Sequence, residues 1–162
     1  MSANPTPYNS NALRNGPMFH LPDPDYQPEF YDAVTSKRLI AWAIDTLLVC
    51  AICALIVPFT AFVALFFWPL LFAVVNFLYR VATLSRGSAT WGMRFAAIEF
   101  RTAEGTLFDG QSAILHTAGY TLSLAVPVLQ VISVVMMLTT PRGQGLTDTV
   151  MGTVALNRRA MG

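Results

Sequence analysis

Three charged residues stand where they could carry out chemistry inside a membrane: Arg38, Asp45 and Asp148. Asp45 is the most informative, because it is the only formal charge between Leu39 and Tyr79. A carboxylate within a bilayer costs on the order of 2.5–3.5 kcal/mol on insertion scales, so it usually forms a pair, binds an ion or stays protonated. We therefore expect Asp45 either to take part in ion transport or to lock helices together through hydrogen bonds.

Arg38 precedes Asp45 by seven residues, which corresponds to about 10 Å and nearly two turns of a helix. Both side chains should project from one helix face. Direct pairing is not expected, because both side chains lean toward the N-terminus of the helix. We expect Asn76, or a residue of the apolar stretch 111–140, to be the partner of Asp45. Considered alone, Arg38 fits an anchor at the membrane surface.

Asp148 follows the last apolar stretch, in the run Gly-Leu-Thr-Asp-Thr. It is expected either to cap a short helix or to form an ion pair with Arg38 or Arg142. His116 is the only residue of the third apolar stretch that could gain a charge, and an imidazole can titrate near neutral pH. We expect it to be either a hydrogen-bonded packing residue or a proton relay.

Other chemistry finds little support in the sequence. Cys50 and Cys53 form a CxxC pair, but no further cysteine or nearby histidine completes a site, so they are expected to be packing residues. There is no phosphate-binding glycine loop, no HExxH and no nucleophile elbow. Net charge is +1, which gives no basic patch for nucleic acid. We expect no enzyme, no metal site, no cofactor and no nucleic-acid partner.

The elements that must position these residues are apolar helices. Only 12% of the 162 residues are charged, against about 25% in a typical soluble domain. The uncharged stretches exceed the roughly 20 residues that cross a bilayer. This pattern predicts an all-α membrane protein with spans at about 36–57, 60–82 and 111–140. Pro58 should end the first span, so that the first two form a helical hairpin, and Pro69 should kink the second.

The third stretch, 111–140, admits two interpretations. As one helix it would be about 45 Å long, well beyond a hydrocarbon thickness of about 30 Å. Gly119 and Pro127 interrupt it. It is either one kinked span or a broken, re-entrant hairpin. A hairpin would return the chain to the side it left, where strands within 94–101 and 151–157 could pair as a small cytoplasmic β element.

Positive residues decide orientation, since they collect on the cytoplasmic side. They flank the predicted hairpin and none lies in its turn: Lys37, Arg38, Arg80, Arg86, Arg94 and Arg101. The N-terminus and the segment 84–110 should therefore be cytoplasmic in a multi-pass protein of the inner (plasma) membrane. Three arginines near the C-terminus favour a cytoplasmic position for that end too: Arg142, Arg158 and Arg159.

The chain divides into one domain with two tails. Residues 1–30 are rich in proline without apolar periodicity, which predicts a disordered cytoplasmic tail. Residues 31–158 form the predicted transmembrane domain, and residues 159–162 form a short tail.

Several stretches together resemble the RDD family of small integral membrane proteins. They are Lys37–Asp45, Gly145–Val154 and Ala89–Arg94, and the resemblance covers about residues 31–158. Met93 stands where the family usually has a lysine, and His116 where it often has an arginine. The resemblance implies that Arg38, Asp45 and Asp148 are the functional residues. It also implies transport of some ligand, since some members are reported as sodium–proton antiporters.

Two functions are therefore expected. The first is cation/proton exchange by a homo-oligomer, in which Asp45 exchanges a proton for a cation while Arg38 and Asp148 pair or gate. Supporting residues would be Asn76, His116 and Arg142. The alternative is an accessory or assembly subunit that packs against a larger membrane complex within the lipid bilayer.

Overall fold

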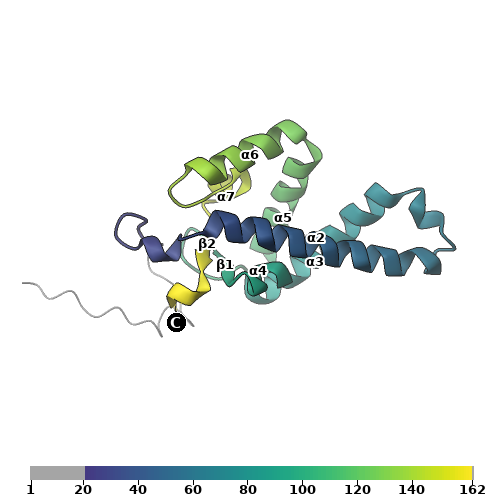
Figure 1. Ribbon diagram of the computed structural model, residues 1–162, viewed down its shortest axis with the longest axis horizontal. Helices are drawn as coiled ribbons and strands as arrows, with labels where there is room; N and C mark the ends of the chain where they lie inside the picture. The colour runs from purple at the N-terminus through teal and green to yellow at the C-terminus, as the bar shows by residue number, and fades with distance from the viewer. Residues whose placement is uncertain (1–20, 162) are drawn as a thin grey trace, which may run out of the picture.

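A computed structural model describes residues 21–161 of the chain (Figure 1). Two of its helices are long and apolar enough to cross a membrane, and a third span results if one bent pair is counted as a single crossing. The chain is therefore a mostly helical membrane protein with a small two-stranded sheet, as predicted.

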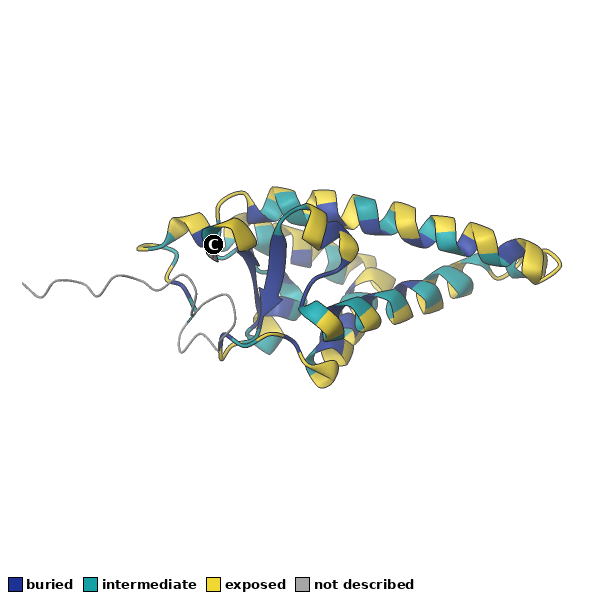
Figure 2. Ribbon diagram, turned by 90° about the horizontal axis from the view of Figure 1, so that it is seen from below, coloured by how far each residue is buried: buried dark blue, intermediate teal, exposed yellow. Residues whose placement is uncertain are grey.

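The first long helix, α2, covers Val34–Phe59 and spans about 39 Å. Its buried residues recur mostly every fourth position, which places them on one helix face: Val34, Ala41, Asp45, Val49, Cys53 and Val57. Its other faces carry exposed apolar side chains such as Leu47 and Leu55. Figure 2 shows this division, with buried residues turned inward and exposed ones outward along the hairpin. A helix with such outer faces suits contact with lipid.

The second long helix, α3, covers Trp68–Gly87 and returns beside α2. It begins later than the predicted residue 60, because a loop with the 3-10 turn η2, Val63–Leu65, precedes it. The predicted kink at Pro69 is wrong. Pro69 lies in the first turn of α3, where the missing N–H removes no helical hydrogen bond, so the proline starts the helix instead of bending it.

The third apolar stretch folds as two helices, α5 over Gly110–Ala125 and α6 over Pro127–Thr139, which meet at 115°. Pro127 starts α6, and the proline restricts the residue before it, which produces the bend. The Thr35 hydroxyl donates to the carbonyl of Met137 at 3.0 Å. The end of α6 therefore lies beside the start of α2, and the predicted break in this stretch is confirmed.

The β element consists of β1, Ile98–Arg101, and β2, Val154–Asn157, paired antiparallel with Phe100 opposite Ala155. The predicted pairing is confirmed, although both strands are shorter than predicted. Arg94, Phe95 and Met151 belong instead to two short helices, α4 over Trp91–Phe95 and α7 over Leu146–Met151. The sheet lies at the end of the molecule opposite the hairpin turn (Figure 1).

Apolar side chains pack on both faces of the sheet. One cluster joins it to the helices and includes Val34, Leu84, Met93, Ile98, Phe100, Phe108 and Ala113. On the other face Phe30 packs against Val154 and Leu156. Phe30 belongs to the 3-10 turn η1, Pro28–Phe30, so two residues of the predicted disordered tail, Leu21 and Phe30, instead pack on the sheet. Residues 1–20 of that tail lie outside the described range.

An ion cluster joins the buried sheet residues Glu99 and Arg101 to the exposed Arg158 of the C-terminal turn η3, Arg158–Met161. Glu99 accepts from Arg101 at 2.6 Å and from Arg158 at 3.2 Å. Most of the predicted tail 159–162 is thus a turn fixed beside the sheet.

Candidate functional site

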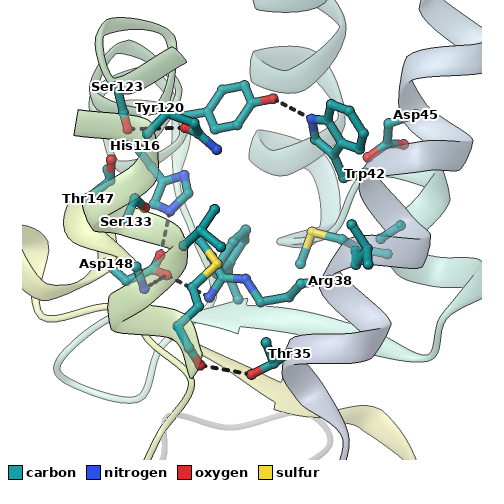
Figure 3. Close-up of a pocket in the computed structure, with 18 of the residues that line it drawn as sticks. Thr35, Arg38, Trp42, Asp45, His116, Tyr120, Ser123, Ser133, Thr147 and Asp148 are labelled. Carbon is teal, nitrogen blue, oxygen red and sulfur yellow. Dashed lines mark hydrogen bonds and ion pairs between the residues drawn. The ribbon is translucent and has the colours of Figure 1, made fainter. Parts of the chain in front are cut away.

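A cavity of about 480 Å³ lies among α2, α3, α5, α6 and α7 (Figure 3). Four of the residues singled out in the sequence line it: Arg38, Asp45, His116 and Asp148. Figure 3 shows Arg38 reaching across toward Asp148, while Trp42 and Tyr120 meet on another wall. Residues more than 100 positions apart in the sequence therefore share one pocket.

Asp148 is the centre of the first cluster and is 1% exposed. Its Oδ2 lies 2.6 Å from the guanidinium of Arg38, and its Oδ1 lies 2.8 Å from Nε2 of His116. Oδ2 also accepts from the backbone N–H of Gly145 at 2.9 Å, which caps the start of α7. Capping and pairing with Arg38, stated as alternatives, therefore occur together.

Burial by itself would raise the pKa of the Asp148 carboxyl, but the Arg38 guanidinium and the hydrogen bond with His116 outweigh it and hold the pKa well below its ordinary value. The carboxylate therefore stays ionised and can only accept hydrogen bonds. Nε2 of His116 must then carry the hydrogen. Its Nδ1 is buried without a hydrogen-bond partner among the described residues.

Asp45 forms a second cluster and is 4% exposed. Its Oδ1 accepts from the Tyr79 hydroxyl at 2.6 Å and from the Gly92 N–H at 2.8 Å. Its Oδ2 accepts from the Thr90 hydroxyl at 2.6 Å. All three donors are neutral. Asp45 thereby ties α2 to α3 and to the first turn of α4.

The prediction that Asn76 or a residue of 111–140 would be the partner of Asp45 was wrong. The antiparallel packing of α3 on α2 places Tyr79 level with Asp45, whereas Asn76 lies almost one turn farther along and lines another cavity with Cys50. The other partners come from α4, an element that the apolar pattern did not indicate. A threonine three residues before Met93 was the available signal, since Thr90 also caps α4 by accepting from that N–H at 3.2 Å.

Gly92 allows α4 to approach α2 closely. A Cβ atom at this position would collide with the carbonyl oxygen of Ala41 and come within 2.9 Å of the Asp45 carboxylate. The hydrogen bond from the Gly92 N–H to Asp45 requires this close approach. Glycine at position 92 is therefore part of the Asp45 cluster.

Arg80 also lines the pocket, and the sequence analysis did not identify it as a site residue. It is 7% exposed, and its guanidinium lies 4.0 Å from the centre of the Tyr120 ring. The Tyr120 hydroxyl accepts from Nε1 of Trp42 at 3.1 Å. A signal existed, because Arg80 follows Asn76 by four residues and both polar groups fall on one face of an apolar helix.

Arg142 does not join the site. It lies in the turn between α6 and α7, outside the pocket lining, and forms no ion pair with a described residue. Asp148 pairs with Arg38 instead, because the capping position of Asp148 turns its carboxylate toward α2. Within residues 21–161 no group of three or more His, Cys, Asp or Glu side chains could hold a metal ion.

A sequence model of the RDD family matches residues 33–152, which is most of the chain. No curated protein and no solved structure matches it. The matched range contains both aspartate clusters and ends at Gly152, just before β2.

Proposed function

Because this chain belongs to the RDD family, we propose that this small membrane protein couples the passage of protons to that of a small solute through the pocket of Arg38, Asp148 and His116. The pocket lies within one chain, so the proposal requires no second protomer. The observation that carries it is the buried Nδ1 of His116, which faces no partner among the described residues while Asp148 holds Nε2.

Proton binding at Nδ1 would turn His116 into a cation beside Arg38. Both cations would then compete for one carboxylate, since Arg38 and His116 each contact an oxygen of Asp148. Arg38 has a second acceptor in the carbonyl of Gly143, at 3.1 Å, and can shift toward it. Because Arg38 is on α2 and Asp148 on α7, protonation would loosen the contact between two walls of the pocket.

The exchange of a proton for a cation at Asp45, expected from the sequence, requires more disruption. A cation would have to displace donors from Tyr79, Thr90 or Gly92, and each of these holds α2 to a neighbouring helix. The proton is therefore assigned to His116, and Asp45 is assigned the role of positioning α4 and α3 around the pocket.

The test is proton flux into proteoliposomes, followed with an internal pH-sensitive dye. Gradients of Na⁺, K⁺ and a series of small organic anions are applied in turn. We expect one of them to drive proton movement by the wild type, and His116→Gln to abolish it. Asp109→Asn, at the exposed cap of α5, is the matched control and should keep the flux.

Two results would overturn the proposal. One is equal flux from wild type and His116→Gln, with both proteins monodisperse. The other is wild-type flux no greater than that of empty liposomes under every gradient. If a larger protein also co-purifies in fixed stoichiometry in mild detergent, the accessory-subunit function takes its place.

We also propose that the end carrying the sheet faces the cytoplasm. Arg94 and Arg101 lie at that end, whereas the hairpin turn 60–67 contains no lysine or arginine. A membrane-impermeant maleimide applied to intact cells should label Thr60→Cys in a chain without native cysteines. It should label Arg159→Cys only after permeabilisation, and the reverse pattern would contradict this orientation.

A further inference from the structure

Arg80 is a buried cation without an anionic partner. It is 7% exposed, its Nε is buried with no hydrogen bond, and its guanidinium forms no ion pair with any described residue. The guanidinium lies over the face of the Tyr120 ring, 4.0 Å from the ring centre. A buried charge without hydrogen bonds is costly, and nearly all buried polar groups in proteins have partners. We therefore expect a hydrogen-bond acceptor for the Arg80 guanidinium to enter the pocket from outside the chain.

The other charges of the pocket cannot supply that partner. Asp148 is engaged by Arg38 and His116, and Asp45 accepts from three neutral donors. Neither carboxylate lies within 4.0 Å of the Arg80 guanidinium. The pocket therefore offers a positive group whose donors are free, whereas its negative groups are already occupied. This arrangement favours an anion over a cation.

We propose that the pocket binds a single oxyanion group carried on an apolar body, with Arg80 as its principal contact. A guanidinium presents a fork of N–H donors that matches a carboxylate or phosphate. The rest of the wall suits an apolar body, because much of it is formed by the side chains of Leu39, Met93, Phe100, Val134, Met137 and Leu138. A volume of about 480 Å³ is in the range of small-molecule sites.

A second free group lies in the same pocket. His116 precedes Tyr120 by four residues on α5, so both side chains project from one helix face and line the pocket with Arg80, which contacts the Tyr120 ring. Once protonated, Nδ1 of His116 can donate a hydrogen bond to the bound oxyanion. The bound proton and the bound anion would then stabilise each other. In this form the inference rests on the proposed function and identifies its solute as an anion. The binding step itself requires no transport.

The first arm of the test uses a soluble anion. The full chain in neutral maltoside detergent is titrated with octanoate by calorimetry, in buffer without phosphate. Charge-assisted hydrogen bonds of this kind correspond to roughly 10- to 100-fold in affinity, so Arg80→Gln should weaken binding by at least about tenfold. Arg80→Lys keeps the charge without the fork and should fall between. Arg86→Gln, exposed on the same helix, is the matched control and should bind as the wild type does.

The second arm uses a lipid head group. The same variants are reconstituted into phosphatidylcholine nanodiscs containing a minor fraction of phosphatidylglycerol, and lipid retained after extraction is counted by native mass spectrometry. Retention of phosphatidylglycerol by wild type and Arg86→Gln, but not by Arg80→Gln, identifies the anion as a lipid phosphate. Octanoate binding without such retention identifies a soluble carboxylate. Either result supports the site.

The proposal is overturned if folded Arg80→Gln and wild type behave alike in both arms, because water would then be the partner of the guanidinium. The transport proposal fails separately. A wild type that binds octanoate through Arg80 but moves no protons would leave the anion site standing and remove proton coupling.

Discussion

Asp45 and Asp148 are both buried carboxylates in one pocket, yet their surroundings differ in kind. Asp45 accepts hydrogen bonds from three neutral groups, and all three belong to the packing of α2 against α3 and α4. Asp148 contacts an arginine and a histidine, one permanently charged and one able to change its charge. A neutral shell fixes a helix position, whereas a charged and titratable shell can be rearranged by one proton.

This difference assigns the two aspartates different roles, one in helix packing and one in chemistry. The cluster around Asp45 is satisfied by the protein and needs nothing from outside. The cluster around Asp148 leaves Nδ1 of His116 free, and the same pocket holds the unpaired guanidinium of Arg80. We therefore expect both aspartate clusters to contribute to stability, but only the Asp148 side of the pocket to contribute directly to function.

Removal of Asp148 should have the largest effect on stability. Asp148→Ala leaves Arg38 and His116 without their shared acceptor, and breaking a buried pair from one side costs about 3–5 kcal/mol. The free energy of unfolding can be measured by SDS titration in mixed micelles. Asp109→Ala, which removes an exposed helix cap, should cost much less. Equal losses of unfolding free energy from the two variants would show that the buried ion pair contributes no more than an exposed helix cap.

Gly92→Ala should sharpen the comparison from the Asp45 side. The added methyl group must displace α4 from the Ala41 carbonyl, and overpacking of this kind costs about 1–3 kcal/mol in the same titration. Gly110→Ala is the matched control, since a Cβ there meets nothing within 4 Å, and it should be neutral or slightly stabilising. A stable Gly92→Ala protein would show that α4 is not held tightly against α2.

Tyr79→Phe should have a smaller effect. It removes one donor to Asp45 and the acceptor of the Trp91 N–H, while Thr90 and Gly92 continue to hold the carboxylate. A lost hydrogen bond of this type costs about 0.5–1.5 kcal/mol. Tyr26→Phe, at an 85% exposed position, should change nothing. A loss above that of Gly92→Ala would indicate that Tyr79 dominates the cluster.

Acid should produce a small effect, and part of it should come from Asp148. Its pKa in the folded chain lies below the unfolded value of 3.8, so its stabilisation is complete above that value and declines as the pH falls. As the pH falls through the unfolded value, the wild type should lose stability through this group, because the unfolded state gains the proton first. Asp148→Asn should lack this part of the pH dependence, and an unchanged slope would contradict it.

The sequence alone determined the apolar spans, the break at Pro127 and the two aspartates, because each depends on local composition and spacing. The long run around Asp45 makes a membrane helix unavoidable, and a proline cannot continue the hydrogen-bond ladder of a helix through position 127. Strand pairing near residues 98 and 157 also followed, since β-prone segments must satisfy their backbone groups.

Only the tertiary structure decided which charges meet. Arg38 forms an ion pair with Asp148 and not with Asp45, because the fold-back at Val126 returns α6 and α7 to the start of α2. Whether a polar residue on an apolar helix faces lipid, a partner or a cavity depends on the rotation and depth of its neighbours, and spacing along one helix does not contain that information. Arg80 is the clearest case, since its spacing from Asn76 placed two polar groups on one helix face but did not reveal the cavity or the Tyr120 ring that Arg80 meets.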